Sequence, residues 1–485
     1  MNQADSLGFE EELRAKGASA APPEQADLVI VNTCSVTASA DQGARQVIRR
    51  VARANPSARI VVTGCYATRR PDEIRELPNV VRVVLNDDKP RLLTFVGRDF
   101  SPAGSDSPTT AERFGDGDGS CGAAIEPGVA GRTAFTLRVQ TGCAEPCSYC
   151  IIPTTRGEPR SVAVDAVLRE VERIAAAGFK EIALTGVHLG SYGRDLTPRS
   201  SLIELLDALS ATTFLKARGA PPPLAEDLAL ERRLSGSGES YGALRPHISF
   251  RISSLEPMDC TPEIVDLVAS AASFAPHFHL PLQHASNRVL AAMRRPYTIE
   301  QYAALVDLIR ARIPHVAIGS DVIVGFPGET DRDFEELAEY LERSPLTHVH
   351  VFPYSDRPGT PATAMRERPA GLVVRERARR VREISARLTT AFRESQIGSV
   401  HRALTLEDGS LVVTGNYLKV RIPPGRARNQ WIDVRITGAD PLRGESMSAN
   451  PQILKFTASE AVPAEKSVFV ASVDVSVDRG YASGQ

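Results

Sequence analysis

Short apolar strands alternate with helical segments from about residue 133 onward, and this alternation constrains the fold more than any other feature of the chain. The expected strands are TLRVQTGC, KEIALTGV, HISFRISSLEP, HFHLPLQH, VAIGSDVIVGFPG and HVHVFPYS. Strands that alternate with helices form parallel sheets with helical crossovers. Six such units in series predict a closed or partly closed α/β barrel, with its active site at the carboxyl ends of the strands.

A separate group of alternating elements occupies residues 27 to 85. Its expected strands are DLVIVNTC, RIVVTGC and VVRVVLN, with the helical stretches QVIRRVARANP and PDEIRELP between them. This pattern predicts an amino-terminal parallel-sheet α/β domain. Two of its strands end on a cysteine, Cys34 and Cys65. Because ligands gather at the carboxyl ends of parallel strands, both cysteines are candidate ligands.

The carboxyl-terminal part of the chain changes character. A helix at about 371 to 395 carries many more arginines than acidic residues, which fits either a solvated helix face or a nucleic-acid patch. Residues 400 to 437 are rich in strands and polar turns, which predicts a small β-barrel. The expected divisions are an amino-terminal domain at 1–98, a linker at 99–132, a barrel at 133–370 with a surface insertion at 216–242, an Arg-rich helix at 371–398, a small β-barrel at 399–440 and a tail at 441–485.

Charge and hydropathy exclude several classes of protein. The formal net charge of -2 gives no global nucleic-acid signal, so any RNA contact must come from a local basic patch. The sequence has no signal peptide and no apolar run long enough to span a membrane. We therefore expect a cytoplasmic protein without a membrane partner.

The strongest chemical signal is TGCAEPCSYCIIP, in which Cys143, Cys147 and Cys150 have C-x3-C-x2-C spacing on the loop that leaves the first barrel strand. Thiolates are soft ligands that suit iron and zinc. A structural zinc site normally needs four ligands, and no fourth Cys or His lies close by in the sequence. Three cysteines can instead hold a four-iron cluster that leaves one iron open to a cofactor.

At these residues the chain resembles the radical S-adenosylmethionine (SAM) superfamily, whose signature has this spacing and an aromatic residue before the third cysteine, here Tyr149. The resemblance implies that the open iron chelates SAM and that an electron from the cluster cleaves it to a 5'-deoxyadenosyl radical. It covers nearly the whole chain outside the linker, the insertion and the tail. The segments that resemble methylthiotransferases, and best those acting on threonylcarbamoyladenosine in tRNA, are VNTCSVTASAD, VVTGCYA, CSYCIIPTTRGEPRS, LTGVHLGSYGRDL, RISSLEP, HLPLQHAS, DVIVGFPGET and VFPYSDRPGTPA.

The methylthiotransferase resemblance implies two 4Fe-4S clusters and three domains: an amino-terminal domain, a partial (βα)6 radical SAM barrel and an RNA-binding TRAM β-barrel. Cys143, Cys147 and Cys150 would bind the SAM cluster, while Cys34 and Cys65 match two ligands of an auxiliary cluster. The implied SAM contacts are Tyr149, Thr185, Gly186, Ser253, Glu256, Ile323 and Gly325. For each of these a turn or packing role stays open, and Glu256 could instead pair with Arg251.

The same resemblance implies the reaction and the partners. A methylthio group would be added to carbon 2 of N6-threonylcarbamoyladenosine at tRNA position 37, with a sulfur donor and an electron donor such as a flavodoxin or ferredoxin. Alternatives are isopentenyl-adenosine in tRNA, an aspartate of a ribosomal protein, or a non-catalytic RNA-binding role. The basic side chains expected to bind the backbone near the tRNA anticodon loop are Arg375, Arg379, Arg382, Lys419, Arg421, Arg426 and Arg428.

The chain starts with MNQADSLGFEEELRAKGA, which predicts a helix with Asn2, Asp5 and Ser6 as cap candidates and Gly17 as its stop. In the resembled family, the first auxiliary ligand lies in Gly-Cys-x-x-Asn-Gln-x-Asp-Ser, and this start matches the second half of that motif. We therefore expect a strand ending in a third cysteine upstream, lost through a late-assigned start codon or a real truncation. Without it, the sheet is expected to lack a strand and expose an edge.

Overall fold

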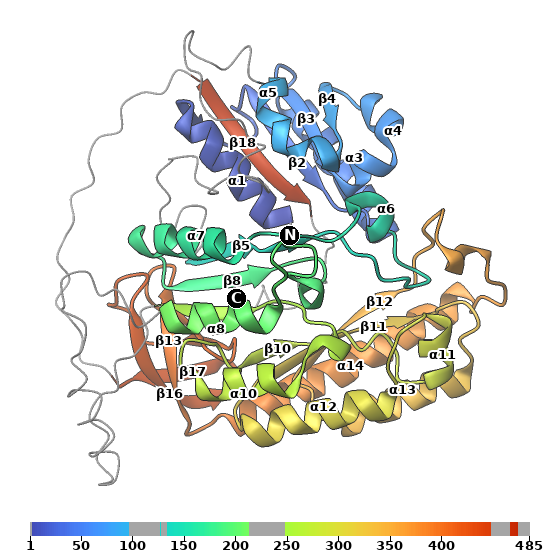
Figure 1. Ribbon diagram of the computed structural model, residues 1–485, viewed down its shortest axis with the longest axis vertical. Coiled ribbons are helices and arrows are strands. Elements are labelled where there is room, and N and C mark those ends of the chain that lie inside the picture. Colours follow the sequence, from blue (N-terminus) through green and yellow to red (C-terminus); the bar gives the residue numbers. More distant parts are fainter. Residues whose placement is uncertain (1, 97–126, 128–132, 213–247, 448–465, 474–485) are drawn as a thin grey trace.

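The structure, a computed structural model, describes residues 2–96, 127, 133–212, 248–447 and 466–473 (Figure 1). The expected insertion at 216–242 lies outside the described residues, as does the expected linker at 99–132 apart from Pro127. The described residues form two groups of parallel strands and one closed β-barrel, which confirms the predicted α/β fold class. None of the helices described is both long and apolar enough to cross a bilayer.

Six parallel strands line the central barrel. The first three strands form one sheet and the last three form a second sheet. An isolated bridge between Ser254 and His279 joins the two sheets. Within the described residues no ladder joins the first strand to the last, so the barrel is a partial one. The strands are β5 (Ala134–Arg138), β8 (Glu181–Thr185), β9 (Ser249–Ile252), β10 (His277–His279), β11 (Ala317–Val324) and β12 (His348–Pro353).

Helices cover the outer face of these strands (Figure 1). The main core lies between the two layers and includes Ile182, Phe250 and Val322. Capping boxes at Thr298 and Thr330 fix where two of the helices begin. The helices are α7 (Val164–Ala176), α8 (Leu202–Thr212), α10 (Pro262–Ser270), α11 (Asn287–Ala292), α12 (Ile299–Arg312), α13 (Asp331–Arg343) and α14 (Gly371–Ser395). Because successive side chains along a strand point to opposite faces, every second side chain of these strands faces the barrel lumen.

The amino-terminal domain is a five-stranded parallel sheet with the order β1-β18-β2-β3-β4. Its strands are β1 (Ala18–Ala20), β2 (Leu28–Thr33), β3 (Arg59–Gly64), β4 (Val80–Val84) and β18 (Lys466–Val473). Its helices are α1 (Asn2–Ala15), α2 (Ala38–Ala54), α3 (Cys65–Arg69), α4 (Pro71–Arg75) and α5 (Leu92–Val96). The two apolar faces of the sheet pack separately, one on α2 and the other on α1 and α5.

Strand β18 comes from the expected tail and lies between β1 and β2 (Figure 1). Its register runs from Val468 opposite Leu28 to Val473 opposite Thr33. Val470 packs against the core cluster that contains Phe9. The expectation of an exposed edge beside β2 is therefore wrong, because the β-branched run SVFVASV pairs with the backbone of β2. The expected strand upstream of α1 stays a prediction.

Helix α1 differs from its expected start. It already begins at Asn2, so Asp5 and Ser6 lie inside the helix, where they cannot act as caps. Asp5 instead points toward the barrel, as described below. Gly17 follows the helix at φ +86°, and this left-handed conformation matches its predicted role as the stop.

Strands β13 to β17 close into the predicted small barrel, in the order β13-β14-β15-β17-β16. Strand β17 lies beyond residue 440, where the small barrel was expected to end. At the amino ends of the central strands, Gly415 lies against Pro276, and Asn416 Nδ2 donates to the His315 carbonyl at 3.0 Å. The strands are β13 (Val400–Leu406), β14 (Leu411–Thr414), β15 (Lys419–Arg421), β16 (Trp431–Ala439) and β17 (Leu442–Ser446).

Candidate functional site

The three closely spaced cysteines lie on the loop that follows β5 and the short strand β6 (Gln140–Thr141). Backbone hydrogen bonds fold this loop, with Cys143 N donating to Gly157 O at 3.0 Å and Cys150 N to Cys147 O at 3.3 Å. The loop ends in the short helix α6 (Ile152–Arg156). All three cysteines are free thiols at the carboxyl ends of the barrel strands.

Polar groups from other segments approach these thiols. Arg295 Nη1 donates to Cys147 Sγ at 3.3 Å, and the Glu145 amide donates to Cys143 Sγ at 3.4 Å. Burial raises the pKa of Cys150 to about 12, so this thiol ionises only when a cation compensates the charge. Three thiols on one loop, two of them already accepting N–H bonds, fit a four-iron cluster with one open iron.

The predicted SAM contacts on β11 gather beside this loop. Tyr149 and Ile323 pack in one apolar cluster, in which the Tyr149 and Phe326 rings meet edge-on with centroids 6.5 Å apart. Gly325 follows the strand at φ +79°, and its amide donates to Glu329 Oε2 at 2.5 Å. The structure therefore brings this part of the predicted set together at the carboxyl end of β11.

The remaining predicted contacts lie where β8 and β9 end. Thr185 is the last residue of β8 and Gly186 follows it, close to the Gln140 side chain. Gln140 Oε1 accepts hydrogen bonds from the next two backbone amides, both at 2.9 Å, and so fixes this turn. Ser253 N donates to Leu184 O at 3.0 Å, which joins the ends of β9 and β8.

Glu256 forms an ion pair with Arg295. The alternative pairing of Glu256 with Arg251 is wrong, because Arg251 instead forms an ion pair with Glu181 at 3.2 Å. Arg295 thus links a predicted SAM contact to Cys147. No local sequence pattern marks this arginine, which reaches the site from a segment far along the chain.

His188, in the loop after β8, is a second residue that sequence reasoning missed, although it lies within LTGVHLGSYG. Its Nε2 lies 2.7 Å from Asp259 Oδ2. Burial alone would lower the pKa of His188, but hydrogen bonds to Asp259 and Cys143 raise it to about 10. These hydrogen bonds connect the loop after β8 to the cysteine loop.

Cys34 and Cys65 lie side by side, since they follow Thr33 and Gly64, which are paired across β2 and β3. Both are buried, and Asn86 Nδ2 lies 3.6 Å from Cys65 Sγ. Burial would raise the pKa of Cys65, but nearby positive charges, Arg156 foremost, lower it. This environment favours the thiolate form that binds metals.

The cysteine pair lies next to α6, the helix in which the triple-cysteine loop ends. Asn86 Nδ2 donates to the carbonyl of Thr155 at 2.6 Å, and Arg156 Nη2 donates to Asn2 Oδ1 at 2.8 Å. Beyond β12, Arg357 donates to Val36 O at 3.1 Å and pairs with Asp41 at 2.8 Å. The amino-terminal domain thus contacts the barrel next to both its first and its last strand.

Asp5 anchors this contact. Its buried carboxylate lies 2.7 Å from Lys89 Nζ and 3.1 Å from Arg138 Nη1, and Arg156 is also near. Burial opposes ionisation, yet these three cations hold the pKa of Asp5 well below its usual range. The helix that starts the chain is therefore fixed to β5 and α6 by charge.

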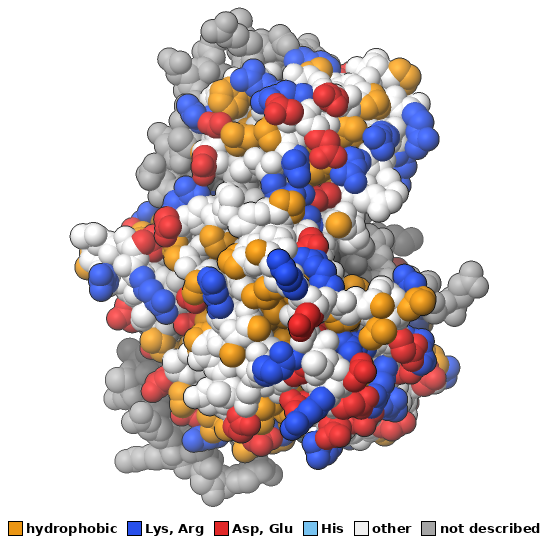
Figure 2. Space-filling view, turned by 90° about the vertical axis from the view of Figure 1, so that its right-hand side faces the viewer, with side chains coloured by type: hydrophobic (Ala, Val, Ile, Leu, Met, Phe, Trp, Pro, Cys, Tyr) orange, Lys and Arg blue, Asp and Glu red, His pale blue; other side chains and the backbone are white. Residues whose placement is uncertain are grey.

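The predicted RNA-binding residues lie on α14, on β15 and in the segment that joins β15 to β16. On α14, Arg379 pairs with Glu376 and Glu383 of its own helix, while the buried Arg377 pairs with Glu329 at 2.7 Å. Basic and acidic side chains are correspondingly interspersed over the lower part of the face in Figure 2. The other predicted residues lie at exposed positions of α14, on β15, or between β15 and β16: Arg375, Arg382, Lys419, Arg421, Arg426 and Arg428.

Comparison with known proteins decides the family. Residues 137–341 match the radical SAM superfamily, and residues 1–86 match a family described as uncharacterized protein family UPF0004. The threonylcarbamoyladenosine tRNA methylthiotransferase MtaB of Aquifex aeolicus is 34% identical over 422 residues, which are 87% of this chain and 94% of that protein. The chain belongs to the radical SAM methylthiotransferase family.

Other members of the family resemble it over similar lengths. The ribosomal protein uS12 methylthiotransferase RimO of Roseiflexus castenholzii is 30% identical, with 90% of this chain and 92% of that protein covered. The tRNA-2-methylthio-N(6)-dimethylallyladenosine synthase of Symbiobacterium thermophilum is 31% identical, with 87% of each covered. As a radical SAM methylthiotransferase, the protein is an enzyme that uses SAM and a 4Fe-4S cluster.

Proposed function

We propose that this methylthiotransferase acts on tRNA and adds a methylthio group to carbon 2 of N6-threonylcarbamoyladenosine at position 37. The observation that carries the proposal is the 34% identity to the Aquifex enzyme along 94% of that enzyme's length, which exceeds the identity to the RimO and dimethylallyladenosine relatives. The enzyme would work in the cytoplasm, with a sulfur donor and an electron donor such as a flavodoxin or ferredoxin.

In this proposal Cys143, Cys147 and Cys150 hold the cluster that binds SAM. When bound, the two cofactors supply the one-electron chemistry that an unactivated C–H bond requires, because such a bond offers no acid–base route. Arg295 orients both Cys147 and Glu256 through its two contacts. The apolar cluster around Tyr149 and Phe326 excludes water from this side of the site.

Cys34 and Cys65 are proposed to supply two ligands of the second 4Fe-4S cluster, from which sulfur is delivered. Three observations support this assignment. The two cysteines follow paired residues at the carboxyl ends of β2 and β3, both are buried, and Arg156 is nearby. The contacts of α6 and of Arg357 hold the carboxyl ends of β2 and β3 close to the carboxyl ends of the barrel strands. Sulfur and substrate would then meet at the same end of the barrel.

RNA binding is proposed to involve both ends of the central barrel. Position 37 would be splayed out of the anticodon loop at the carboxyl ends of the strands. Lys419 and Arg421 lie on β15, in the small barrel that docks at the opposite ends. The eight residues of β11 span about 26 Å, so the anticodon arm would run along the barrel to reach both regions.

The substrate can be tested directly with the reconstituted enzyme, SAM and a reductant. We would offer tRNA carrying threonylcarbamoyladenosine, tRNA carrying isopentenyl-adenosine, and ribosomal protein uS12, and analyse each product by mass spectrometry. A methylthio group on threonylcarbamoyladenosine alone is expected, and a Cys143→Ala variant should give none. Modification of either other substrate in preference would contradict the proposal.

A further inference from the structure

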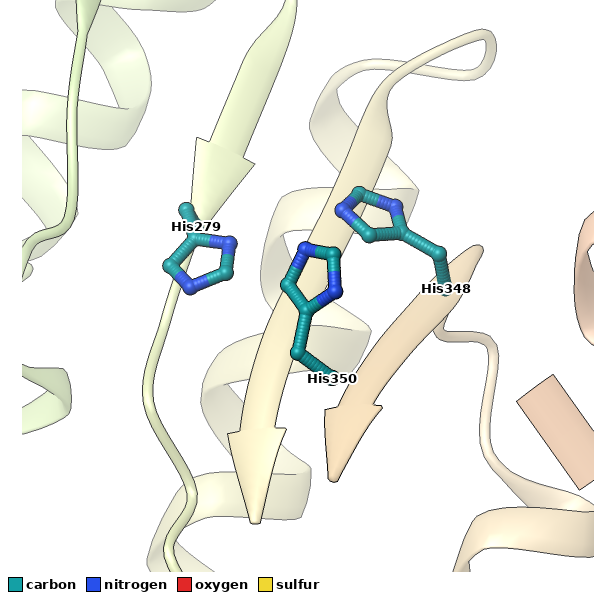
Figure 3. A group of neighbouring side chains, drawn as sticks. All are labelled: His279, His348 and His350. Carbon is teal, nitrogen blue, oxygen red and sulfur yellow. The ribbon is translucent and has the colours of Figure 1, made fainter. Parts of the chain in front are cut away.

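Three histidines face the lumen of the barrel, deeper than the cysteine loop. His279 lies on β10, while His348 and His350 lie on β12, and their rings come together in front of β11 (Figure 3). One ring nitrogen from each histidine lies within 4.8 Å of the others. Among the described residues, this group has the donor types and spacing that suit a single metal ion.

Gly319, on the intervening strand β11, leaves the space that these rings occupy. It is paired with His279 on one side and with His348 on the other. A Cβ atom at this glycine would collide with Nε2 of His348 and crowd Nδ1 of His279. Those two nitrogens therefore converge on the same point above β11.

The outward ring nitrogens of the same two histidines are already held in place. Asp321 Oδ1 lies 3.0 Å from His279 Nε2. His348 Nδ1 lies 3.1 Å from Thr347 Oγ1, and the Thr347 hydroxyl donates to the carbonyl of Ile318 at 3.1 Å. With the hydroxyl proton used there, the Thr347 oxygen can accept a ring proton from His348 Nδ1, which leaves a lone pair on Nε2. Metal-binding histidines use their second nitrogen in this way, toward a carboxylate or another oxygen.

His350 completes the group. Its ring centroid lies 5.3 Å from that of His348 and 5.8 Å from that of His279. Among the residues described, nothing forms a hydrogen bond with its ring nitrogens. A histidine beside two oriented imidazoles, with no hydrogen bond of its own, is suited to act as the third ligand.

We propose that His279, His348 and His350 bind one Zn²⁺ ion in the barrel lumen, separately from the iron–sulfur clusters. Neutral imidazoles suit zinc, and three of them leave a fourth position for water. The ion would tie β10 to β12 across the glycine of β11 and stiffen the partial barrel. This site is independent of which substrate the enzyme modifies.

The proposal can be tested on the anaerobically purified holoenzyme with its clusters in place. The protein is incubated with one equivalent of Zn²⁺ and desalted, and its zinc is measured by mass spectrometry and zinc-edge X-ray absorption. We expect about one zinc per chain with nitrogen ligands at roughly 2.0–2.1 Å. His350→Asn should lower zinc retention at least tenfold, and Asp321→Asn should weaken affinity by about 10- to 100-fold.

A matched control is His401→Ala, which removes a histidine that contacts Ser399 in the small barrel and should leave zinc retention unchanged. Iron content and the thermal unfolding midpoint of each variant establish that it is folded. A sulfur shell at about 2.3 Å would place the zinc on cysteines and overturn the proposal. Equal zinc in the wild type and in His350→Asn, or no retained zinc in the wild type, would overturn it as well.

Discussion

At the residue scale, Arg295 has the most direct influence on the proposed SAM site after the cysteines. It donates to Cys147 and pairs with Glu256, so its loss removes a positive charge and misplaces both partners. We predict that Arg295→Gln slows reductive SAM cleavage by about 10- to 100-fold and makes the cluster harder to reduce. The exposed neighbour Arg294, changed to Gln, should leave the rate and the reduction potential unaltered. An unchanged potential in Arg295→Gln would refute this role.

Asp5 gives a prediction about stability. Replacing it by Ala leaves Lys89 and Arg138 buried without their counter-charge, and losing one member of a buried ion pair costs about 3–5 kcal/mol. Urea unfolding monitored by circular dichroism should show this loss in the free energy of unfolding. Glu10→Ala on the same helix removes only the partly exposed pair with Arg14, and should cost about 1 kcal/mol or less. Similar losses in both variants would contradict the argument.

A site residue could be predicted from the sequence only where a local pattern of residues marks it. The three loop cysteines lie close together in the chain, so their spacing alone indicated a cluster. Arg295 meets Cys147 from 148 positions away, and Arg156 meets Asn2 from 154 positions away. Such partners depend on how distant segments pack, and no local pattern marks them. For the same reason the histidine group, drawn from strands about 70 residues apart, could not be foreseen.

At the scale of whole elements, β18 is the clearest departure from expectation. The six central strands and β2, β3 and β4 followed from local alternation, whereas β1 and β17 were not expected. The tail's strand-like run gave no indication of which sheet it joins. The pairing of β18 with β2 is a long-range contact. It depends on the backbone groups of β2 that would otherwise be unpaired and on the apolar face of α1.

The position of β18 can be tested by Val470→Asp, because this side chain packs against the core beside Phe9. A charge there should destabilise the amino-terminal domain by about 1–3 kcal/mol and raise proteolysis within residues 2–96. Limited proteolysis with mass spectrometry would locate the cleavage. The same cleavage pattern in the variant and the wild type would show that β18 does not pack on this sheet.

The basic elements predict different effects on RNA binding. Charge reversal of Lys419 and Arg421 on β15 should weaken tRNA affinity and reduce the slope of log affinity against log salt by about 0.7–0.9 per lost phosphate contact. SAM cleavage should persist. Arg379→Gln should have a smaller effect, because Glu376 and Glu383 already neutralise that charge. Unchanged tRNA affinity after reversal on β15 would remove this strand from the RNA-binding surface.

At the scale of the whole molecule, the arrangement of the domains fits the proposal that two cysteine sites serve one reaction. The amino-terminal domain contacts the barrel through Asp5 beside the first strand and through Arg357 beyond the last. Both cysteine sites consequently lie at the carboxyl ends of the barrel strands, joined by α6. The small barrel docks at the opposite ends, so it does not cover this face.

The central claim is tested most directly in a bacterial strain that lacks its own threonylcarbamoyladenosine methylthiotransferase. The strain is complemented with this gene or with a Cys143→Ala version, and its tRNA nucleosides are analysed by mass spectrometry. We predict that the wild-type gene restores the methylthio group on threonylcarbamoyladenosine and on no other nucleoside, and that the variant restores nothing. An unchanged nucleoside profile with the wild-type gene, or a methylthio group on isopentenyl-adenosine instead, would contradict the account.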